Sequence, residues 1–243
     1  MPFTIAHFSI FLPFNRCKFL SITGLIFGAM APDLEYFSRM KILATYGHLW
    51  LEGLWFNVLI GLMYCFVFHL FVRDVTIQNL PNFLRSRFYQ YQNFNWIKYF
   101  KSNWLKVIFS LIIGIYSHLL WDSFTHEWGF FVQRIPFVNF NWISNPIELK
   151  GYKFLQYFSS IIGLIFIGLW ILKQPKSEVN FQRFNFKFWL IVLFLSCIIS
   201  WVRFTFFPVE MMTGNLIVVP MMAGFLTLVF LGILHTFKIK PQV

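Results

Sequence analysis

Histidines and carboxylates recur in this sequence at spacings that suit a metal site. The clearest pair is His118 and Asp122, four residues apart near the end of a long apolar run. On an α-helix this spacing puts both side chains on one face, about 6 Å apart along the axis. Both residue types bind divalent ions such as zinc, so the pair can share one ion. The alternative is that the two side chains bond only each other and stabilise helix packing.

A second group of polar residues can converge on this pair. Asp33 and Glu35 follow Pro32 at the end of the N-terminal apolar region. His48 and Glu52 repeat the four-residue spacing, and we expect a helix that begins near residue 46 to carry both on one face. Asp33 is also well placed to cap a short helix, which would explain it without a metal.

His7 and His126 need particular backbone paths to join the others. His7 reaches them only if the N-terminal region folds back on itself. His126 falls about 12 Å beyond His118 on an unbroken helix, so it approaches the same ion only if the helix ends near Ser123. Otherwise it serves a second ion or supports the ligands from outside.

These residues divide into two expected chemical roles. The expected ligands of a divalent ion are His7, Asp33, His48, His118 and Asp122. A general base within one water molecule of the ion is expected among Glu35, Glu52 and His126. Histidine with carboxylate suits zinc, manganese or iron, and the residue types do not choose among these cofactors.

The composition identifies the lipid bilayer as the solvent of this chain. Of its 243 residues, 58% are hydrophobic and 22% aromatic, whereas only 12% are charged. Soluble domains carry about 25% charged residues. The formal charge of +11 would suggest nucleic acid in a soluble protein, but membrane proteins collect Lys and Arg in cytoplasmic loops. We therefore expect the lipid bilayer, and no nucleic acid, as a partner.

Five apolar segments are long enough to cross about 30 Å of hydrocarbon as helices. They cover approximately residues 49–72, 104–122, 154–172, 187–207 and 215–237. Residues 1–32 hold two shorter apolar stretches around a polar tip at 15–18, which predicts a re-entrant helical hairpin or one marginal span. The expected fold is an all-α integral membrane protein, with a single domain of five long transmembrane helices plus this hairpin or sixth span.

The distribution of Lys and Arg sets the expected orientation. These residues concentrate in the connections 73–103 and 173–187 and at the C-terminus. The positive-inside rule makes these segments cytoplasmic, so the chain is expected in the cytoplasmic (inner) membrane with its C-terminus inside. The loop 123–153 and the candidate site are then extracytoplasmic.

Four stretches of the sequence form a distinctive combination. They are Met1-Pro2-Phe3-Thr4 with His7, the run from Gly28 to Phe37, the run from Ser117 to His126, and Gly151-Tyr152-Lys153 with Gln156 and Ser159-Ser160. In these stretches the chain resembles a family of uncharacterised bacterial multi-pass membrane proteins, the domain of unknown function 4184. The resemblance implies a topology and a set of polar positions, but no reaction.

The same polar positions show a looser similarity to membrane-bound metal-dependent hydrolases. The matching elements are His7, Pro32-Asp33-Leu34-Glu35, Gly47-His48, and His118 with Asp122. Glu35 stands where that group has a second Asp, and Gly47 stands where it has a hydroxyl residue. The similarity implies a metal-dependent hydrolase with a modified ligand set.

The leading hypothesis is thus a divalent-metal-dependent hydrolase that acts on an amphiphilic phosphoester or lipid at the outer leaflet. A carrier or pathway for ions or protons would use the same residues, although no paired interrupted helices mark a repeat-based transporter. A membrane scaffold without catalysis is the third hypothesis. The sequence has no Gly-rich phosphate loop, His-Glu-x-x-His motif or Gly-x-Ser-x-Gly elbow.

Overall fold

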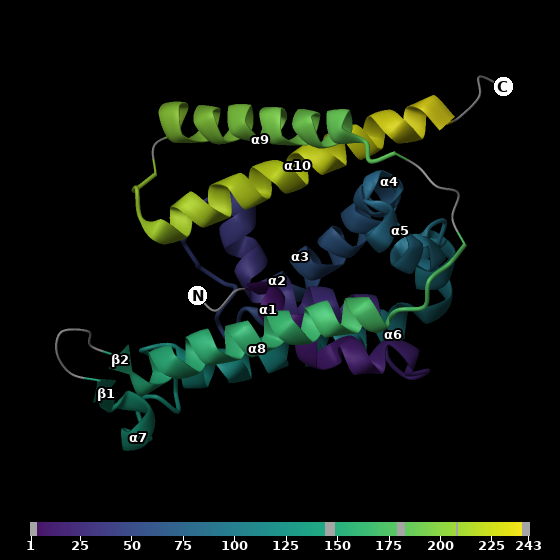
Figure 1. The fold of residues 1–243 in the computed structure, drawn as a ribbon. Coiled ribbons are helices and arrows are strands. Elements are labelled where there is room, and N and C mark those ends of the chain that lie inside the picture. Colours follow the sequence, from purple (N-terminus) through teal and green to yellow (C-terminus); the bar gives the residue numbers. More distant parts are fainter. Residues whose placement is uncertain (1–3, 144–148, 179–182, 208, 240–243) are drawn as a thin grey trace. The chain divides into compact units, whose positions relative to one another are not determined.

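Helices make up most of the computed structural model of this chain, which describes residues 4–143, 149–178, 183–207 and 209–239 (Figure 1). Residues 1–3 of the opening motif lie outside these ranges, as do parts of the expected connections at 144–148, 179–182 and 208. The statements below concern the described residues.

The elements follow one another as short N-terminal helices, longer apolar helices and one small hairpin. In order they are α1 (Thr4–His7), the 3₁₀ segment η1 (Phe8–Arg16), α2 (Ile22–Arg39), α3 (Leu54–Val67), the π-helical segment η2 (Phe68–Val72), α4 (Arg73–Asn79), α5 (Asn82–Phe88), η3 (Tyr89–Tyr91), α6 (Trp96–Thr125), α7 (Pro136–Asn139), β1 (Asn141–Ile143), β2 (Leu149–Lys150), α8 (Gly151–Lys173), α9 (Phe186–Phe206) and α10 (Thr213–Ile239). The two strands pair antiparallel.

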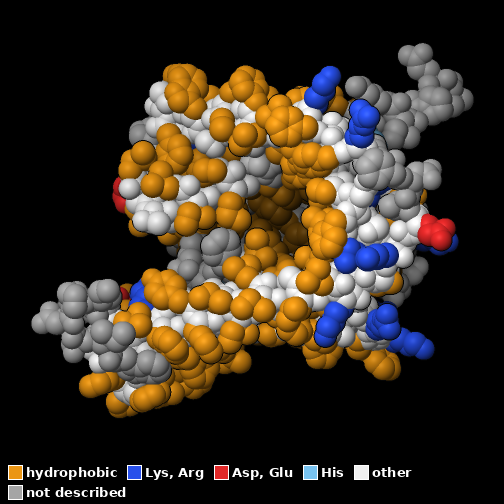
Figure 2. Space-filling model, viewed as in Figure 1, with side chains coloured by type: hydrophobic (Ala, Val, Ile, Leu, Met, Phe, Trp, Pro, Cys, Tyr) orange, Lys and Arg blue, Asp and Glu red, His pale blue; other side chains and the backbone are white. Residues whose placement is uncertain are grey.

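Five helical stretches are long and apolar enough to cross a membrane, which confirms the predicted fold class. They are Leu54–Asn79, Trp96–Thr125, Gly151–Lys173, Phe186–Phe206 and Thr213–Phe237. Their outer faces are hydrophobic, as Figure 2 shows over α8 and α9. No residue of α9 is buried within the structure. Such a surface is stable only in lipid, so the chain is a multi-pass membrane protein.

The start of the first long helix differs from the prediction. We expected helix from about residue 46 onward, with His48 and Glu52 on one face, but α3 begins at Leu54 and residues 45–53 form an irregular loop. The loop folds back over the helix start, where the Asn57 side-chain amide donates to the Gly47 carbonyl oxygen at 2.8 Å. Glycine at 47 and 53 disfavours helix at both ends of this loop.

The chain folds as two compact units. The first comprises residues 1–34, 45–62 and 104–170, and the second comprises residues 35–44, 63–103 and 171–243. One boundary falls at Asn103, whose φ of −137° and ψ of 21° interrupt the helical geometry of α6. All of the expected metal ligands belong to the first unit.

In the first unit, α2 and α6 approach so closely that only glycine fits at the contact. A Cβ atom added to Gly114 would lie 2.5 Å from the Ala29 nitrogen and 2.5 Å from the Leu25 carbonyl oxygen. Gly24 and Gly28 of α2 meet the α6 backbone in the same way. Small residues commonly allow such contacts between membrane helices, where lipid removes the hydrophobic drive for association.

The N-terminal segment packs back on α2. Residues 17–21 connect η1 to α2, and Phe11 of η1 forms a buried cluster with Leu25 and Ala29. The Ser21 backbone nitrogen donates to Ser110 Oγ at 2.8 Å, which ties the connection to α6. This path returns the start of the chain to the C-terminal half of α2.

The second unit is held together by α9, α10 and polar contacts from the segments around them. The Ile42 backbone nitrogen donates to Asn215 Oδ1 at 2.7 Å, and the Trp189 indole donates to the Asn79 carbonyl oxygen at 2.8 Å. Arg73 is buried and pairs with Asp74 at 2.6 Å. These bonds satisfy polar groups that lipid cannot satisfy.

The glycine contact between α2 and α6 makes a testable prediction. Gly114→Ala should lower the free energy of unfolding in detergent by about 2 kcal/mol, because the added methyl group must displace backbone atoms. Gly168→Ala on α8 is the matched control, since nothing lies within 4 Å of its Cβ position. Thermal unfolding of the two variants checks this, and equal stabilities would contradict the close contact.

Candidate metal centre

Six polar side chains of the first unit converge on one point. His7 ends α1, Asp33 lies in α2, His48 lies in the loop before α3, and His118 and Asp122 lie on one face of α6. His126 follows the end of α6 at Thr125. Asp33, His7, His118 and Asp122 are all buried. The close glycine contact between α2 and α6 allows the Asp33 carboxylate to face His118 and Asp122 of α6.

Four of these side chains surround one position. His48 Nε2 lies 3.5 Å from Asp33 Oδ1 and 3.4 Å from Asp122 Oδ2, and His118 Nε2 lies 3.8 Å and 3.2 Å from the same two oxygens. Four ligands bound at about 2.1 Å in a tetrahedron around zinc lie about 3.4 Å from one another. Most N–H···O hydrogen bonds are shorter, at about 2.9–3.0 Å. The spacing therefore fits ligands around an ion better than hydrogen-bonded pairs.

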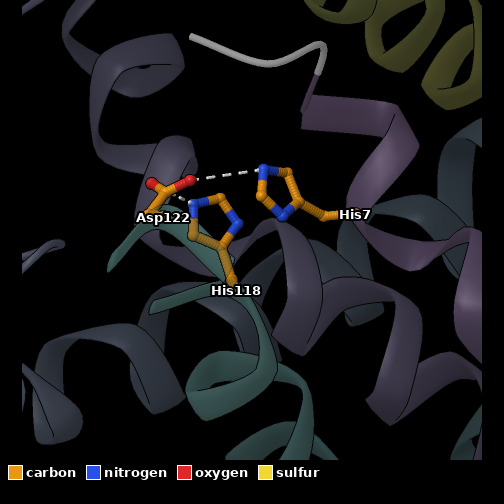
Figure 3. A group of neighbouring side chains, drawn as sticks. All are labelled: His7, His118 and Asp122. Carbon is orange, nitrogen blue, oxygen red and sulfur yellow. Dashed lines mark ion pairs between the residues drawn. The ribbon is translucent and has the colours of Figure 1, made fainter. Parts of the chain in front are cut away.

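His7 extends the cluster on the other side of Asp122. Its ring stacks on that of His118 with centroids 3.9 Å apart, and its Nε2 lies 3.6 Å from Asp122 Oδ1 (Figure 3). His7, His118 and Asp122 form one group of three that could hold a metal ion, and Asp33, His48 and His118 form another. His118 is common to both groups.

A backbone carbonyl on the far side of the ring from the carboxylates fixes the orientation of His118. Its Nδ1 lies 2.7 Å from the Ala29 carbonyl oxygen, an acceptor that requires a proton on Nδ1. In the neutral ring, Nε2 then carries a lone pair and faces the two carboxylates. Metal-binding histidines are usually held in this way, with the second nitrogen donating to a carbonyl or carboxylate.

Several buried atoms of the cluster lack hydrogen-bond partners within the described part of the chain. These atoms are Nε2 of His7, Nε2 of His118 and Oδ1 of Asp122. A buried polar atom without a partner costs about 1–3 kcal/mol. A bound cation would explain why three such atoms lie side by side, because it can accept a lone pair from each of them.

Asp33 is oriented by a residue to which the sequence assigned no chemical role. The Thr4 hydroxyl is buried and donates to Asp33 Oδ2 at 2.5 Å, which leaves Oδ1 facing the histidines. Thr4 belongs to the opening motif of the chain, but its spacing from Asp33 carries no helical or strand periodicity. Only the return of the N-terminal segment to α2 brings the two residues together.

Two histidines outside the long helices have strongly shifted pKa values. Burial and the neighbouring His118 lower the pKa of His7 to about 3, so this ring is neutral and can bind a cation. Burial alone would also lower the pKa of His48, but the attraction of its ring to the Asp122 and Asp33 carboxylates outweighs burial and raises that pKa to about 9. A metal ion must therefore displace a proton from His48.

The three expected general bases lie in different surroundings. His126 Nδ1 is 3.3 Å from Asp122 Oδ1, and its side chain is 35% exposed, so it lies at the edge of the cluster. Glu35 is buried in the second unit and accepts two hydrogen bonds from Arg39, at 2.8 Å and 3.0 Å. Glu52 is exposed in the loop and forms no ion pair within the described residues. Of the three, the structure brings His126 to the cluster.

Fold and site together define a multi-pass membrane protein whose helices enclose a cluster of histidines and aspartates. The chain belongs to the family described as domain of unknown function (DUF4184), whose model matches residues 1–236. This confirms the resemblance found in the sequence. A search of curated proteins and a search of solved structures each gave no match.

The raised pKa of His48 predicts how the metal-free protein responds to pH. The favourable pairing of protonated His48 is fully present below its ordinary pKa of 6.5 and is lost as the pH rises through about 9. The melting temperature of chelator-treated protein should therefore fall across this range. His48→Gln should show a flatter profile, and parallel profiles for the two proteins would contradict the pairing.

Proposed function

We propose that this protein is a divalent-metal-dependent hydrolase of the cytoplasmic membrane, acting on an amphiphilic phosphoester or lipid at the outer leaflet. The observation that carries the proposal is the arrangement of His48, His118, Asp33 and Asp122, whose facing N and O atoms are 3.2–3.8 Å apart. His7 is the fifth proposed ligand. Zinc, manganese and iron all suit this set of ligands.

Burial makes a metal a better explanation than simple packing. Two carboxylates are withdrawn from water at Asp33 and Asp122, which is costly unless cations compensate them. Protonated His48 supplies one positive charge, but the neutral His7 ring supplies none. A divalent ion compensates both carboxylates at once and occupies the lone pairs of His7 and His118.

The residues around the ligands have distinct proposed roles. A bound divalent ion would activate water and polarise a phosphoryl or carbonyl oxygen. His126 is the proposed general base, because it contacts Asp122 and, with 35% of its side chain exposed, is the most exposed member of the cluster. Thr4 and the Ala29 carbonyl hold Asp33 and His118 in their orientations.

The membrane location supports an amphiphilic substrate. The cluster lies near the C-terminal end of α6, beside helices that are apolar enough to span lipid. The excess of Lys and Arg in the other connections argues that this end of α6 is extracytoplasmic and the C-terminus cytoplasmic. A lipid or lipid-linked phosphoester in the outer leaflet would then reach the site without leaving the bilayer.

Metal analysis of the purified protein is the first test. We expect about one divalent ion per chain or more, lost in both His118→Ala and Asp122→Asn, because each substitution removes a buried ligand. His235→Ala in α10 and Glu127→Gln in the loop after α6 are matched controls that should keep the metal. Elemental analysis in detergent checks all five proteins, with circular dichroism to confirm folding.

The same samples separate the competing hypotheses. Metal-dependent release of phosphate or fatty acid from lipid substrates, absent in Asp122→Asn, would support hydrolysis. A parent protein that binds no metal even after reconstitution would remove the proposal and favour a scaffold. Metal transport into proteoliposomes that requires His118, without hydrolysis, would favour a carrier.

The contact from Thr4 to Asp33 gives a finer prediction. Thr4→Val keeps the shape of the side chain but removes the hydroxyl donor, so Asp33 loses its fixed orientation. Metal affinity should fall by about tenfold, the lower end of the range for such supporting residues. Thr227→Val, which removes a buried hydroxyl from α10, is the control. Competition with a metal indicator dye measures both, and equal affinities would refute the role of Thr4.

A further inference from the structure

A cavity of about 620 Å³ lies beside the cluster in the first unit, between the N-terminal segment, α6 and α8. We propose that this cavity holds one hydrocarbon chain of the lipid substrate while the polar group of the lipid lies at the metal centre. The inference rests on the proposed function and names the part of the substrate that the protein recognises. The volume of the cavity falls within the usual range of ligand pockets.

One face of α8 supplies the long wall of the cavity. The spacing of the lining residues is three or four, so they form one stripe over three helical turns, about 16 Å long. The stripe consists of Leu155, Phe158, Ser159, Ile162, Gly163 and Phe166. A long and mostly apolar wall matches an extended hydrocarbon chain better than a compact polar molecule.

Gly163 lets the N-terminal segment form one wall of the cavity. A Cβ atom at this position would lie 2.9 Å from the Ala6 side chain, so the absence of a side chain permits α1 to pack on α8. Ala6 and the adjacent His7 both line the cavity. The packing of α1 on α8 therefore places a proposed metal ligand in the cavity wall.

His7 connects the cavity with the metal centre. His7 lines the cavity, while its Nε2 faces Asp122 Oδ1 at 3.6 Å. On α6, Ser117 and Trp121 line the cavity and directly precede His118 and Asp122. Neighbouring faces of the same helix turns thus carry the cavity wall and the ligands, so a chain in the cavity would hold an attached phosphate close to the ion.

The polar atoms of the cavity are few and partly paired. The Trp121 indole nitrogen donates to Ser159 Oγ at 3.3 Å. The apolar members Phe158 and Ile162 are 51% and 49% exposed and belong to a membrane-spanning helix. The cavity is therefore open to lipid, and a hydrocarbon chain can enter it from the bilayer.

Photocrosslinking tests the proposal. The probe is phosphatidic acid with a diazirine in one acyl chain, incorporated with the protein into phosphatidylcholine vesicles. We expect labelling of the α8 stripe to be suppressed by excess unlabelled phosphatidic acid, whereas labelling of the lipid-facing Ile161 and Ile165 is not. Inorganic phosphate should not compete, because it lacks the chain.

Two matched variants locate the effect. Ile162→Trp fills the cavity and should reduce the competable labelling by about tenfold. Ile161→Trp adds the same bulk at a side chain that is 58% exposed and outside the cavity, and should leave it unchanged. Labelling that does not compete, that phosphate suppresses as well as the lipid does, or that falls equally in both variants would overturn the proposal.

Metal content of the same samples separates this inference from the proposed function. A normal metal content with no competable labelling would contradict the proposal that the cavity binds a hydrocarbon chain, but would leave the proposed metal centre supported. If the protein binds no metal but shows competable labelling that depends on Ile162, the cavity binds lipid but the proposed hydrolase activity is contradicted. The lipid would then not be a substrate. Both properties together support the full proposal.

Discussion

Asp122 is the group on which the first unit depends. Four imidazoles lie around its carboxylate, with nitrogen to oxygen distances of 3.6 Å for His7, 3.4 Å for His48, 3.2 Å for His118 and 3.3 Å for His126. A carboxylate in apolar surroundings is stable only when cations or donors compensate it. The N-terminal segment, α6, the loop before α3 and the loop after α6 all contribute to that compensation.

This requirement explains why the helices pack as they do. Asp33 can face the α6 ligands only if α2 lies against α6, and the glycines at 28 and 114 allow that distance. His7 can stack on His118 only if the N-terminal segment returns along α2, which the cluster of Phe11 with α2 residues stabilises. In lipid, where apolar packing gives little net drive, small residues and polar contacts must supply the specificity.

The sequence predicted the parts of this structure that depend on local pattern. Apolar length located the five long helices, and the four-residue spacing of His118 and Asp122 placed both on one helix face. The prediction failed at residues 46–53, where the four-residue spacing of His48 and Glu52 suggested a helix but the chain forms a loop. Gly47 and Gly53 permit this loop, and the contact of Gly47 with the Asn57 side chain stabilises it, which no local pattern reveals. Thr4 could not be assigned a role because its spacing from Asp33 follows no helical or strand period, and only the return of the N-terminal segment to α2 brings the two side chains together.

The same constraint links the proposed metal centre to the proposed chain pocket. A cluster built for structure alone would be satisfied internally, yet nitrogens of His7 and His118 point at Asp122 without hydrogen bonds in the described part of the chain. His7 also borders an apolar cavity that a well-packed helix bundle would close. Both features maintain space, one for a cation and one for hydrocarbon, and His7 lies between them. An amphiphile is the class of ligand that requires both spaces at once, which is why the two proposals reinforce each other.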